Sequence, residues 1–523
     1  MQMVGLLDCT LRDGGYVNNW MFGASVITQV CRKSILAGMD VVELGYLSTK
    51  NSGSPDCARY SSLHDVRRAY CEGKNNTQRY AVMINYGEYP IGQIETAEPD
   101  DPVIRVAFHK KDMKAAIDYI RILQQKGHKC FVQPMGALDY SDADYLELVG
   151  MVNEVEPEAF YLVDSFGVIE MTDFRRLLFL TDNNLKKTIV MGYHAHNNLQ
   201  QAYSNAKFMV EQHLSHNLII DTSVFGMGRG AGNLNSELFA RYLNQEHNKH
   251  YNIEPILELY DECLKPIYAQ SPWGYSLPFY LSSIHNCHPN YASFFADKNT
   301  LSVKSMHELL SSIKDADKIS FSKEKAAEYY NRYQENYIDD RNDVEQFRQA
   351  IDQRPILVLA PGKSIVSYQD KVKEFVKKQK PVVIGVNRAS EIYEYDYLFV
   401  ASEKRLEEKP GNVKSFIKTS NLHKVLSDTI QVNYSSYLSS NPEISDNPTL
   451  MLLNLFVSMG IKEVSVAGFD GFSLVPEDNY FAKGLSMGSS IASKVEKNAQ
   501  LSKEVQLLRN KIDICFLTPS LYI

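Results

Sequence analysis

The 523-residue sequence predicts an α/β protein with two sheet-containing domains, and three observations carry the prediction. Eight short apolar runs recur through the first half of the chain, and helix-like segments lie between them. Polar residues stand at the carboxyl ends of these runs, and a second series of apolar runs starts after residue 353. Apolar strands that alternate with helices are typical of a parallel sheet covered on both sides.

The predicted strands of the first half are residues 4–8, 40–45, 80–85, 103–108, 129–134, 159–164, 188–194 and 218–223. The helix-like segments include residues 25–37, 111–126, 145–155 and 199–212. Eight strand–helix units in about 225 residues fit a (β/α)8, or TIM, barrel. Reactive groups in such a barrel lie at the carboxyl ends of the strands, so we expect the site there.

The remaining chain divides at a change of pattern. Residues 246–352 are predicted to be a helical extension and linker, whose aromatic insert (271–295) is either a lid over the barrel mouth or a packed loop. From residue 353 the runs ILVLAPGKS, PVVIGVN, DYLFVAS, KEVSVAGFDGF and ICFLTPS predict an open, Rossmann-like α/β domain. The predicted regions are therefore 1–245, 246–352 and 353–523.

Composition narrows the class of protein. The formal net charge of −8 argues against nucleic acid or an anionic membrane as the main partner. Eight scattered cysteines without a Cys-x-x-Cys pair are expected to be reduced thiols, which indicates a cytoplasmic location. No run reaches the roughly 20 apolar residues of a spanning helix, so membrane insertion is not expected. A homo-oligomer is left open.

The strongest single signal is GYHAHNN, residues 192–198. His194 and His196 are two residues apart on a strand and so face the same side. Alone they could be two histidines that share a polar strand end, but Asp13 is expected across the same mouth. Two imidazoles and a carboxylate favour a divalent metal site, with Mn or Mg the first choice and Co or Zn the alternatives.

Arg12 and Glu43 end the first two predicted strands. A divalent metal could polarise a 2-oxo acid, and the guanidinium of Arg12 could hold the developing enolate oxygen. Glu43 could orient Arg12, or it could be satisfied locally. His109 and Ser165 end further strands and are expected to contact the substrate. The glycine-rich loop 224–233 follows the eighth strand, where Asn233 could add an oxygen ligand.

These elements, in this order, resemble the HMGL-like, or DRE-TIM, metallolyase superfamily, which includes hydroxymethylglutaryl-CoA lyase, isopropylmalate synthase and 4-hydroxy-2-oxovalerate aldolase. The matching residues are TLRDGG (10–15), Glu43 in VVELG, HAHNN (194–198) and GMGRGAGN (226–233). The resemblance implies a metal held by Asp13, His194 and His196, with Asn233 as a further ligand. It also implies that Arg12 stabilises the enolate and that Glu43 is its partner.

Two departures from the family pattern bear on the reaction. The hydroxy-oxovalerate aldolases carry an acid/base histidine shortly after the Arg-Asp pair, where this sequence has Tyr16. The CoA lyases carry a cysteine in the glycine-rich loop, and GMGRGAG has none. The proton must then move through Tyr16, a metal-bound water, or a histidine such as His109, His285 or His288.

The resemblance implies a metal-dependent aldolase that joins or splits a 4-hydroxy-2-oxo acid, with a 2-oxo acid and an aldehyde as small-molecule partners. A Claisen-type synthase that uses acyl-CoA is one alternative. A barrel that has lost catalysis and supports the C-terminal domain is another.

The sequence LAPGKS (359–364) is not a Walker motif, because Leu357 stands where that motif needs a glycine. Gly362, Lys363 and Ser364 can still form an anion-binding turn. The C-terminal pattern is loosely similar to a domain found beside bacterial surface-glycan enzymes, which implies a nucleotide or nucleotide-sugar site. A purely structural domain is the alternative.

Overall fold

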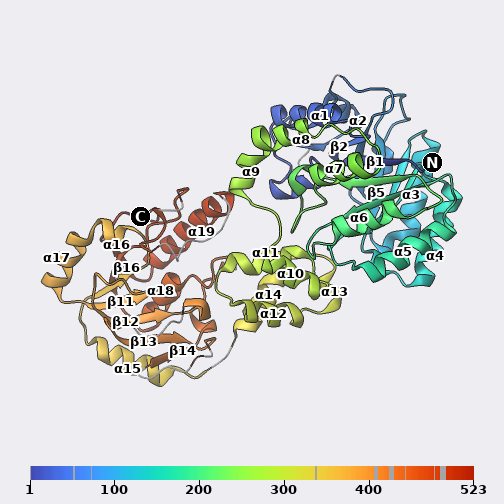
Figure 1. Cartoon of the computed structure of the whole chain (residues 1–523). Helices are drawn as coiled ribbons and strands as arrows, with labels where there is room; N and C mark the ends of the chain where they lie inside the picture. Colours follow the sequence, from blue (N-terminus) through green and yellow to red (C-terminus); the bar gives the residue numbers. More distant parts are fainter. Residues whose placement is uncertain are drawn as a thin grey trace. The chain divides into compact units, whose positions relative to one another are not determined.

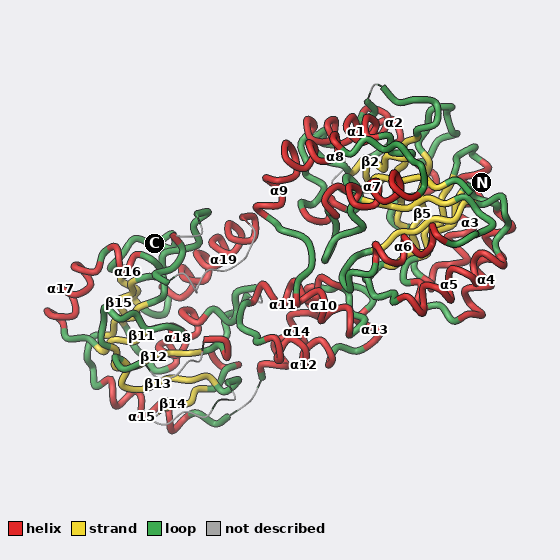
Figure 2. The backbone as a smooth tube through the Cα atoms, viewed as in Figure 1, coloured by secondary structure: helices red, strands yellow, loops and turns green. Residues whose placement is uncertain are grey.

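A computed structural model describes residues 2–50, 53–71, 73–335, 338–405, 410–422, 424, 429–441, 443–475, 478–482 and 491–523. The chain forms two compact units, Met1–Pro289 and Asn290–Ile523. Each unit contains strands with helices around them (Figures 1 and 2). The helical middle region is divided between the two units, and the three-part division at residues 245 and 352 stays a prediction.

The first unit contains a closed parallel barrel. Its sheet closes because β1 pairs with both β2 and β9, and the two-residue strand β3 (Arg59–Tyr60) only extends β2. Every predicted strand overlaps an observed one, so the (β/α)8 prediction is confirmed. The barrel strands are β1 (Val4–Asp8), β2 (Val41–Leu47), β4 (Arg79–Asn85), β5 (Val103–Phe108), β6 (Cys130–Pro134), β7 (Ala159–Asp164), β8 (Val190–Ala195) and β9 (Leu218–Thr222).

Helices cover the outside of the barrel (Figure 1). They pack there because one face of each is apolar, and local signals fix their ends. The first helix ends at Gly38, in the left-handed conformation that favours glycine, and the fourth starts with a capping box of Ser141 and Asp144. These helices are α1 (Ala24–Ala37), α2 (Leu63–Arg68), α3 (Met113–Gln125), α4 (Asp142–Val155), α5 (Met171–Asn184), α6 (Ala202–Glu211) and α7 (Ser236–Glu246).

A segment after the barrel contacts the loops at its mouth. The segment contains α8 (Glu254–Leu259), a π-helical turn at Tyr260–Leu264, α9 (Lys265–Gln270) and α10 (Leu277–Ile284). The indole of Trp273 donates to the Phe225 carbonyl (2.8 Å), and the Ser283 hydroxyl donates to the Phe166 carbonyl (3.2 Å). Both acceptors follow the carboxyl ends of strands. The aromatic insert therefore lies against the mouth, and its opening and closing as a lid stays a prediction.

The second unit is built on an open parallel sheet of seven strands in the order β14-β13-β12-β11-β10-β15-β16. The five predicted runs are strands, which confirms the α/β class of this region. The sequence prediction missed β13 and β14, whose mixed polar and apolar residues do not form an apolar run. The strands are β10 (Ile356–Leu359), β11 (Val382–Val386), β12 (Tyr395–Val400), β13 (Val413–Thr419), β14 (Thr429–Val432), β15 (Glu463–Ala467) and β16 (Asp513–Phe516).

Some helices of this unit precede the sheet in the chain, and others lie between its strands. They are α11 (Pro289–Lys298), α12 (Val303–Ser312), α13 (Asp315–Lys318), α14 (Lys323–Gln334), α15 (Arg341–Ile351), α16 (Ser364–Ser367), α17 (Gln369–Gln379), α18 (Pro448–Ser458) and α19 (Ile491–Arg509). Among the helices in the described part of the chain, none combines the length and apolarity needed to cross a membrane.

Candidate active site

Arg12 and Asp13 lie in a tight turn that follows β1. The carbonyl of Cys9 accepts hydrogen bonds from the backbone N–H groups of Arg12 (3.1 Å) and Asp13 (2.8 Å). The indole of Trp20 donates to the Arg12 carbonyl at 2.7 Å. It packs so closely over Gly15 that a Cβ there would lie 2.1 Å from the ring. The glycine therefore permits the packing that fixes this turn, and both side chains are buried at the mouth.

His194 and His196 reach Asp13 from the other side of the barrel. His194 lies in β8 and His196 just beyond it, so both rings face the mouth. The Nε2 atom of His194 is 3.0 Å from Asp13 Oδ2, and that of His196 is 3.5 Å from the same oxygen. One potential ligand atom from each of the three residues lies within 4.8 Å of the others. This spacing suits a shared cation.

Asn233, in the glycine-rich loop, lies next to His196, and its role as a further ligand stays a prediction. Its backbone forms an isolated bridge with that of His196. The amide Nδ2 donates to the Met227 carbonyl at 3.1 Å, so the opposite side of the amide presents Oδ1. Gly228 makes room for this amide, because a Cβ there would lie 2.3 Å from Asn233 Nδ2.

Several buried atoms of this group have no hydrogen-bond partner among the described residues. They are both carboxylate oxygens of Asp13, Nδ1 of His196 and Oδ1 of Asn233. Arg12 and His194 neighbour Asp13 at ion-pair distance but without hydrogen-bond angles. A buried polar atom without a partner costs about 1–3 kcal/mol. The unpaired oxygens and imidazoles, with no thiolate, fit a divalent cation such as Mn, Mg, Co or Zn.

Asp221, at the end of β9, orients His194. Its Oδ2 and Arg12 Nη2 lie 3.0 Å and 3.5 Å from His194 Nδ1, so that side of the ring is occupied and Nε2 faces Asp13. A carboxylate behind a ligand imidazole is the usual support of a metal-binding histidine. Burial raises the pKa of Asp221, but Arg105 and His194 lower it below its usual value.

Two arginines link the carboxylates into one buried network. Oε2 of Glu43 lies 2.9 Å from Arg12 Nε and 2.6 Å from Arg105 Nη1. Arg105 Nη2 contacts Asp221, and Arg12 Nη1 is 3.1 Å from Asp13. Three carboxylates face two guanidinium groups, so without the imidazoles the network has one more negative charge than positive charges. Because buried charges need compensation, this excess favours a cation at Asp13.

The pKa shifts agree with this charge arrangement. Burial raises the pKa of Asp13, but His196, Arg12 and His194 lower it far below its usual value. Burial lowers the pKa of His196 to about 3, although Asp13 opposes the shift. Burial and Arg12 lower the pKa of His194, but Asp13 and Asp221 raise it above its usual value. Asp13 is therefore charged and His196 neutral near pH 7, as a metal ligand requires.

Arg229 and His288 form a second wall of the mouth. Arg229, in the glycine-rich loop, donates to the Ser165 carbonyl at 2.7 Å and lies 3.1 Å from His288 Nε2. Its guanidinium also lies over the ring of Tyr16 at 5.3 Å. The Tyr16 hydroxyl is 3.2 Å from that of Tyr46. Burial and Arg229 hold the pKa of His288 well below its usual value, so this imidazole is neutral.

The remaining predicted residues of the barrel are placed differently. Ser165 accepts a hydrogen bond from the Gly136 N–H at 3.1 Å, so its hydroxyl holds two loops together. His109 follows β5, half-buried, and burial lowers its pKa. His285 ends α10, three residues before His288. Their predicted roles in substrate contact and proton transfer stay predictions.

In the second unit, the amides expected to bind an anion already have a partner. The Ser364 N–H donates to Asp470 at 2.8 Å, and the Ser364 hydroxyl contacts the same carboxylate. Lys363 pairs with Asp478 at 2.5 Å. A Cβ on Gly362 would lie 2.3 Å from the Gly468 carbonyl, so this glycine permits a close backbone approach. The nucleotide role of Gly362, Lys363 and Ser364 stays a prediction.

Sequence reasoning missed Arg105 and Arg229 and named His288 only as an alternative. Arg105 had a signal, since a charged residue interrupts the apolar run VIRVAF. Asn198 was not assigned a role either, although it is the last residue of the HAHNN motif. Its amide accepts from the Ala231 N–H (2.7 Å) and donates to the Phe166 carbonyl (2.9 Å), which ties the glycine-rich loop to the β7 loop.

A closed parallel barrel with a buried carboxylate, two imidazoles and an arginine at its mouth has the groups that metal-dependent catalysis requires. Residues 3–261 match the sequence model of the HMGL-like family, and this part of the chain belongs to that family. The predicted resemblance is thereby confirmed. The chain is a metal-dependent carbon–carbon lyase.

Curated relatives match the same half of the chain. It is 28% identical over 260 residues to 4-hydroxy-2-oxovalerate aldolase 2 of Salinispora arenicola, which covers 49% of this chain and 71% of the relative. It is 22% identical over 276 residues to oxaloacetate decarboxylase of Mycobacterium tuberculosis, covering 52% and 79% of the two chains.

Solved structures also align with the first part of the chain. The HMG-CoA lyase of Brucella melitensis is 15% identical with a TM-score of 0.41. The alignment covers 51% of this chain and 100% of the lyase. The carboxyl transferase domain of Rhizobium etli pyruvate carboxylase is 13% identical with a TM-score of 0.47, covering 60% and 57%.

Proposed function

We propose that the barrel is a divalent-metal-dependent aldolase that forms or cleaves a 4-hydroxy-2-oxo acid through a pyruvate-type enolate. The observation that carries the proposal is the buried group of Asp13, His194 and His196 beside Arg12. The aldolase relatives support the same reaction class. Mn or Mg is the preferred metal, because carboxylate, amide and imidazole ligands without thiolate suit these ions.

Asp13, His194, His196 and Asn233 would hold the cation, which supplies Lewis-acid polarisation of a 2-oxo acid. Arg12 stabilises the negative charge that develops on the enolate oxygen. Its Nε and Nη1 atoms are held by Glu43 and Asp13, so its plane is fixed before the substrate arrives. Glu43 therefore acts through Arg12, as a positioning residue.

We assign the proton transfer to His288 rather than to Tyr16 or His285. Because arginine only donates, the contact with Arg229 identifies Nε2 of His288 as the acceptor nitrogen. When the substrate hydroxyl replaces Arg229 at this nitrogen, the imidazole can take its proton. The C3–C4 bond then breaks, its electron pair enters the enolate, and the C4 oxygen becomes the aldehyde carbonyl.

The test is retro-aldol cleavage of 4-hydroxy-2-oxovalerate, measured as pyruvate release through lactate dehydrogenase. Treatment with a chelator should abolish the rate, and Mn²⁺ or Mg²⁺ should restore it. Asp13→Asn should lower kcat by more than about a thousandfold and remove the bound metal. The matched control is Asp118→Asn on α3, where an exposed carboxylate is lost. Activity that persists in Asp13→Asn or after chelation contradicts the proposal.

Oxaloacetate is a second substrate to include, because a relative decarboxylates it. Loss of its C4 carboxylate leaves the same pyruvate enolate at the same group of residues. Thiol release from acetyl-CoA would instead support the predicted Claisen-type synthase, and a protein without bound metal or activity would support the scaffold. A place in surface-glycan biosynthesis stays a prediction.

A further inference from the structure

The second unit contains a pocket of about 180 Å³ at the carboxyl ends of its strands. Its lining includes Gly362 after β10, Asn387 after β11, Ser402 after β12 and Asp470 after β15. The chain runs outward from β10 to β14 and then returns to place β15 on the other side of β10. In open α/β sheets, ligands bind in the crevice at such a reversal of strand order.

We propose that this pocket binds a small phosphorylated ligand with a polar ring, either a nucleotide or a sugar phosphate. The pocket belongs to the second unit alone, and its lining residues run from Asp297 to Tyr522. The proposal is independent of the aldolase reaction, because none of its residues belongs to the barrel.

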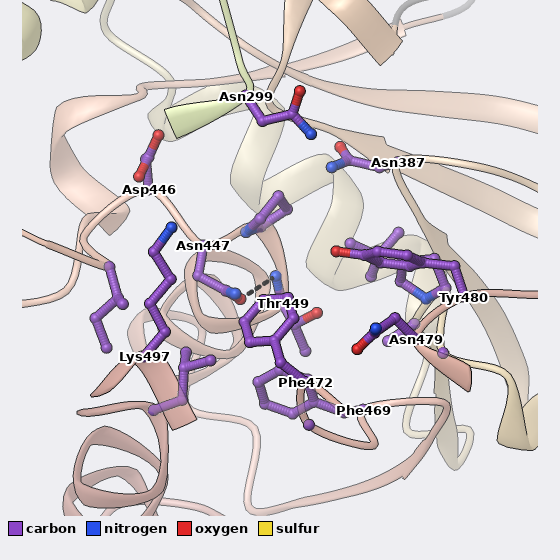
Figure 3. A pocket seen from close by; sticks show the side chains of 18 of the residues that line it. Asn299, Asn387, Asp446, Asn447, Thr449, Phe469, Phe472, Asn479, Tyr480 and Lys497 are labelled. Atoms are coloured by element: carbon purple, nitrogen blue, oxygen red, sulfur yellow. Dashed lines mark hydrogen bonds between the residues drawn. The ribbon is translucent and has the colours of Figure 1, made fainter. Parts of the chain in front are cut away.

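The amide side chains of the pocket offer donors. Asn299 and Asn387 lie near each other at one side of the pocket, and Asn447 lies across from them (Figure 3). Each uses its Oδ1 within the protein: Asn299 accepts from Lys404 Nζ (2.6 Å), Asn387 from the Ala401 N–H (3.4 Å), and Asn447 from the Thr449 N–H (3.1 Å). Among the described residues, none accepts a hydrogen bond from their Nδ2 atoms. Three N–H₂ groups thus remain for a ligand rich in acceptors.

Lys497 adds a positive charge to these donors. Its side chain is drawn toward Asp446 and Asn447 in Figure 3, and its ammonium donates to the Asp297 carbonyl at 3.3 Å. An ammonium has three donors, so this bond leaves two for a ligand. Burial lowers the pKa of Lys497, although nearby carboxylates, of which Asp297 acts most strongly, oppose the shift. An oxyanion beside Lys497 would replace the hydration that the side chain has lost.

Three of the four carboxylates that line the pocket are bonded within the protein, and the fourth, Asp297, lies beside Lys497. Asp470 accepts from Ser364, and Asp446 accepts from the Tyr330 hydroxyl at 2.5 Å and lies 3.6 Å from Lys298 Nζ. Glu443 contacts Lys323 and Gln500. These pairings reduce the repulsion that an anionic ligand would meet.

Aromatic side chains form the apolar part of the wall. Phe469 and Phe472 lie together below the centre of Figure 3, and Tyr480 stands at the side opposite Lys497. Rings at such positions stack on a planar base or on the apolar face of a sugar. A ligand with phosphate oxygens at Lys497 and a ring against these aromatic side chains would be a phosphorylated nucleoside or sugar.

The experiment is titration calorimetry of the full chain with AMP, UMP, glucose 1-phosphate and inorganic phosphate. At least one of the first three should bind about tenfold more tightly than inorganic phosphate, since only they fill the aromatic side. Tighter binding of AMP or UMP identifies a nucleotide, and tighter binding of glucose 1-phosphate a sugar phosphate. Equal binding of inorganic phosphate, or no binding of any probe, overturns the proposal.

Two variants locate the binding. Asn387→Asp keeps the size of the side chain but replaces a donor with a negative charge, and Lys497→Met removes the ammonium. Each should weaken the binding by about tenfold or more and leave pyruvate release by the barrel unchanged. Lys373→Met, at an exposed position of α17, is the matched control. Far-ultraviolet circular dichroism verifies folding, and wild-type affinity in both folded variants overturns the assignment.

Discussion

The barrel and the C-terminal unit place polar groups at equivalent ends of parallel strands but prepare them in opposite ways. At the barrel mouth, buried carboxylates and arginines face one another, and the oxygens of Asp13 lack hydrogen bonds. In the second unit, Asp470 already bonds the amide and hydroxyl of Ser364, and the pocket offers mainly N–H donors. The first arrangement suits chemistry at a cation, and the second suits recognition of a ligand.

Removal of Arg105 should have the largest effect and tests whether charge pairing holds the barrel together. Arg105→Met leaves Glu43 and Asp221 buried without their shared cation. The free energy of unfolding should fall by about 3–5 kcal/mol, measured by urea titration. Arg121→Met, which removes an exposed arginine on α3, should change it by less than about 1 kcal/mol. A loss of similar size in both variants would show that the buried pairing of Arg105 with Glu43 and Asp221 does not stabilise the barrel.

Arg12→Lys should separate enolate stabilisation from metal binding. The lysine keeps the charge but lacks the planar fork that Glu43 and Asp13 hold. We expect kcat to fall by about 10²–10³-fold while the metal content of the protein stays at the wild-type level. Loss of metal together with activity would instead show that Arg12 supports the ligands.

The second unit should depend on close packing instead of charge. Gly362→Ala places a Cβ 2.3 Å from the Gly468 carbonyl and 2.5 Å from Asp470. The expected destabilisation is about 1–3 kcal/mol, and hydrogen exchange should detect it in the second unit alone. Gly411→Ala, where nothing lies within 4 Å of the added Cβ, is the control. An equal loss of stability in the two variants would show that close packing at Gly362 does not stabilise the second unit.

The smallest expected effect concerns pH. The pKa of His288 is lowered in the folded chain, so below about pH 6.5 the unfolded chain binds more protons and stability falls as pH falls. His288→Gln should therefore lose less stability than the wild type between about pH 6.5 and pH 5. Urea midpoints at the two pH values measure this difference, and His64→Gln, at an exposed position, should leave it unchanged.

The barrel could be predicted because its strands are buried on both faces and so form continuous apolar runs, as in β6 and β7. The strands β13 and β14 could not, since Lys418 and Gln431 interrupt their apolar residues. The positions of Asp13, His194 and His196 followed from strand ends and the period of a strand. The contact of Arg229 with His288 did not, because it joins loops that lie far apart in the sequence and only the fold brings them together.

The buried network also limits which substitutions this protein can accept during evolution. Its members are Arg12, Glu43, Arg105, Asp221 and His194. Each member is the partner of another, so replacing one leaves a second charge unpaired in the interior. The effects of such replacements are not additive, and a second change can offset the first. These positions should therefore be conserved or substituted together, while exposed positions on the barrel helices should be substituted independently.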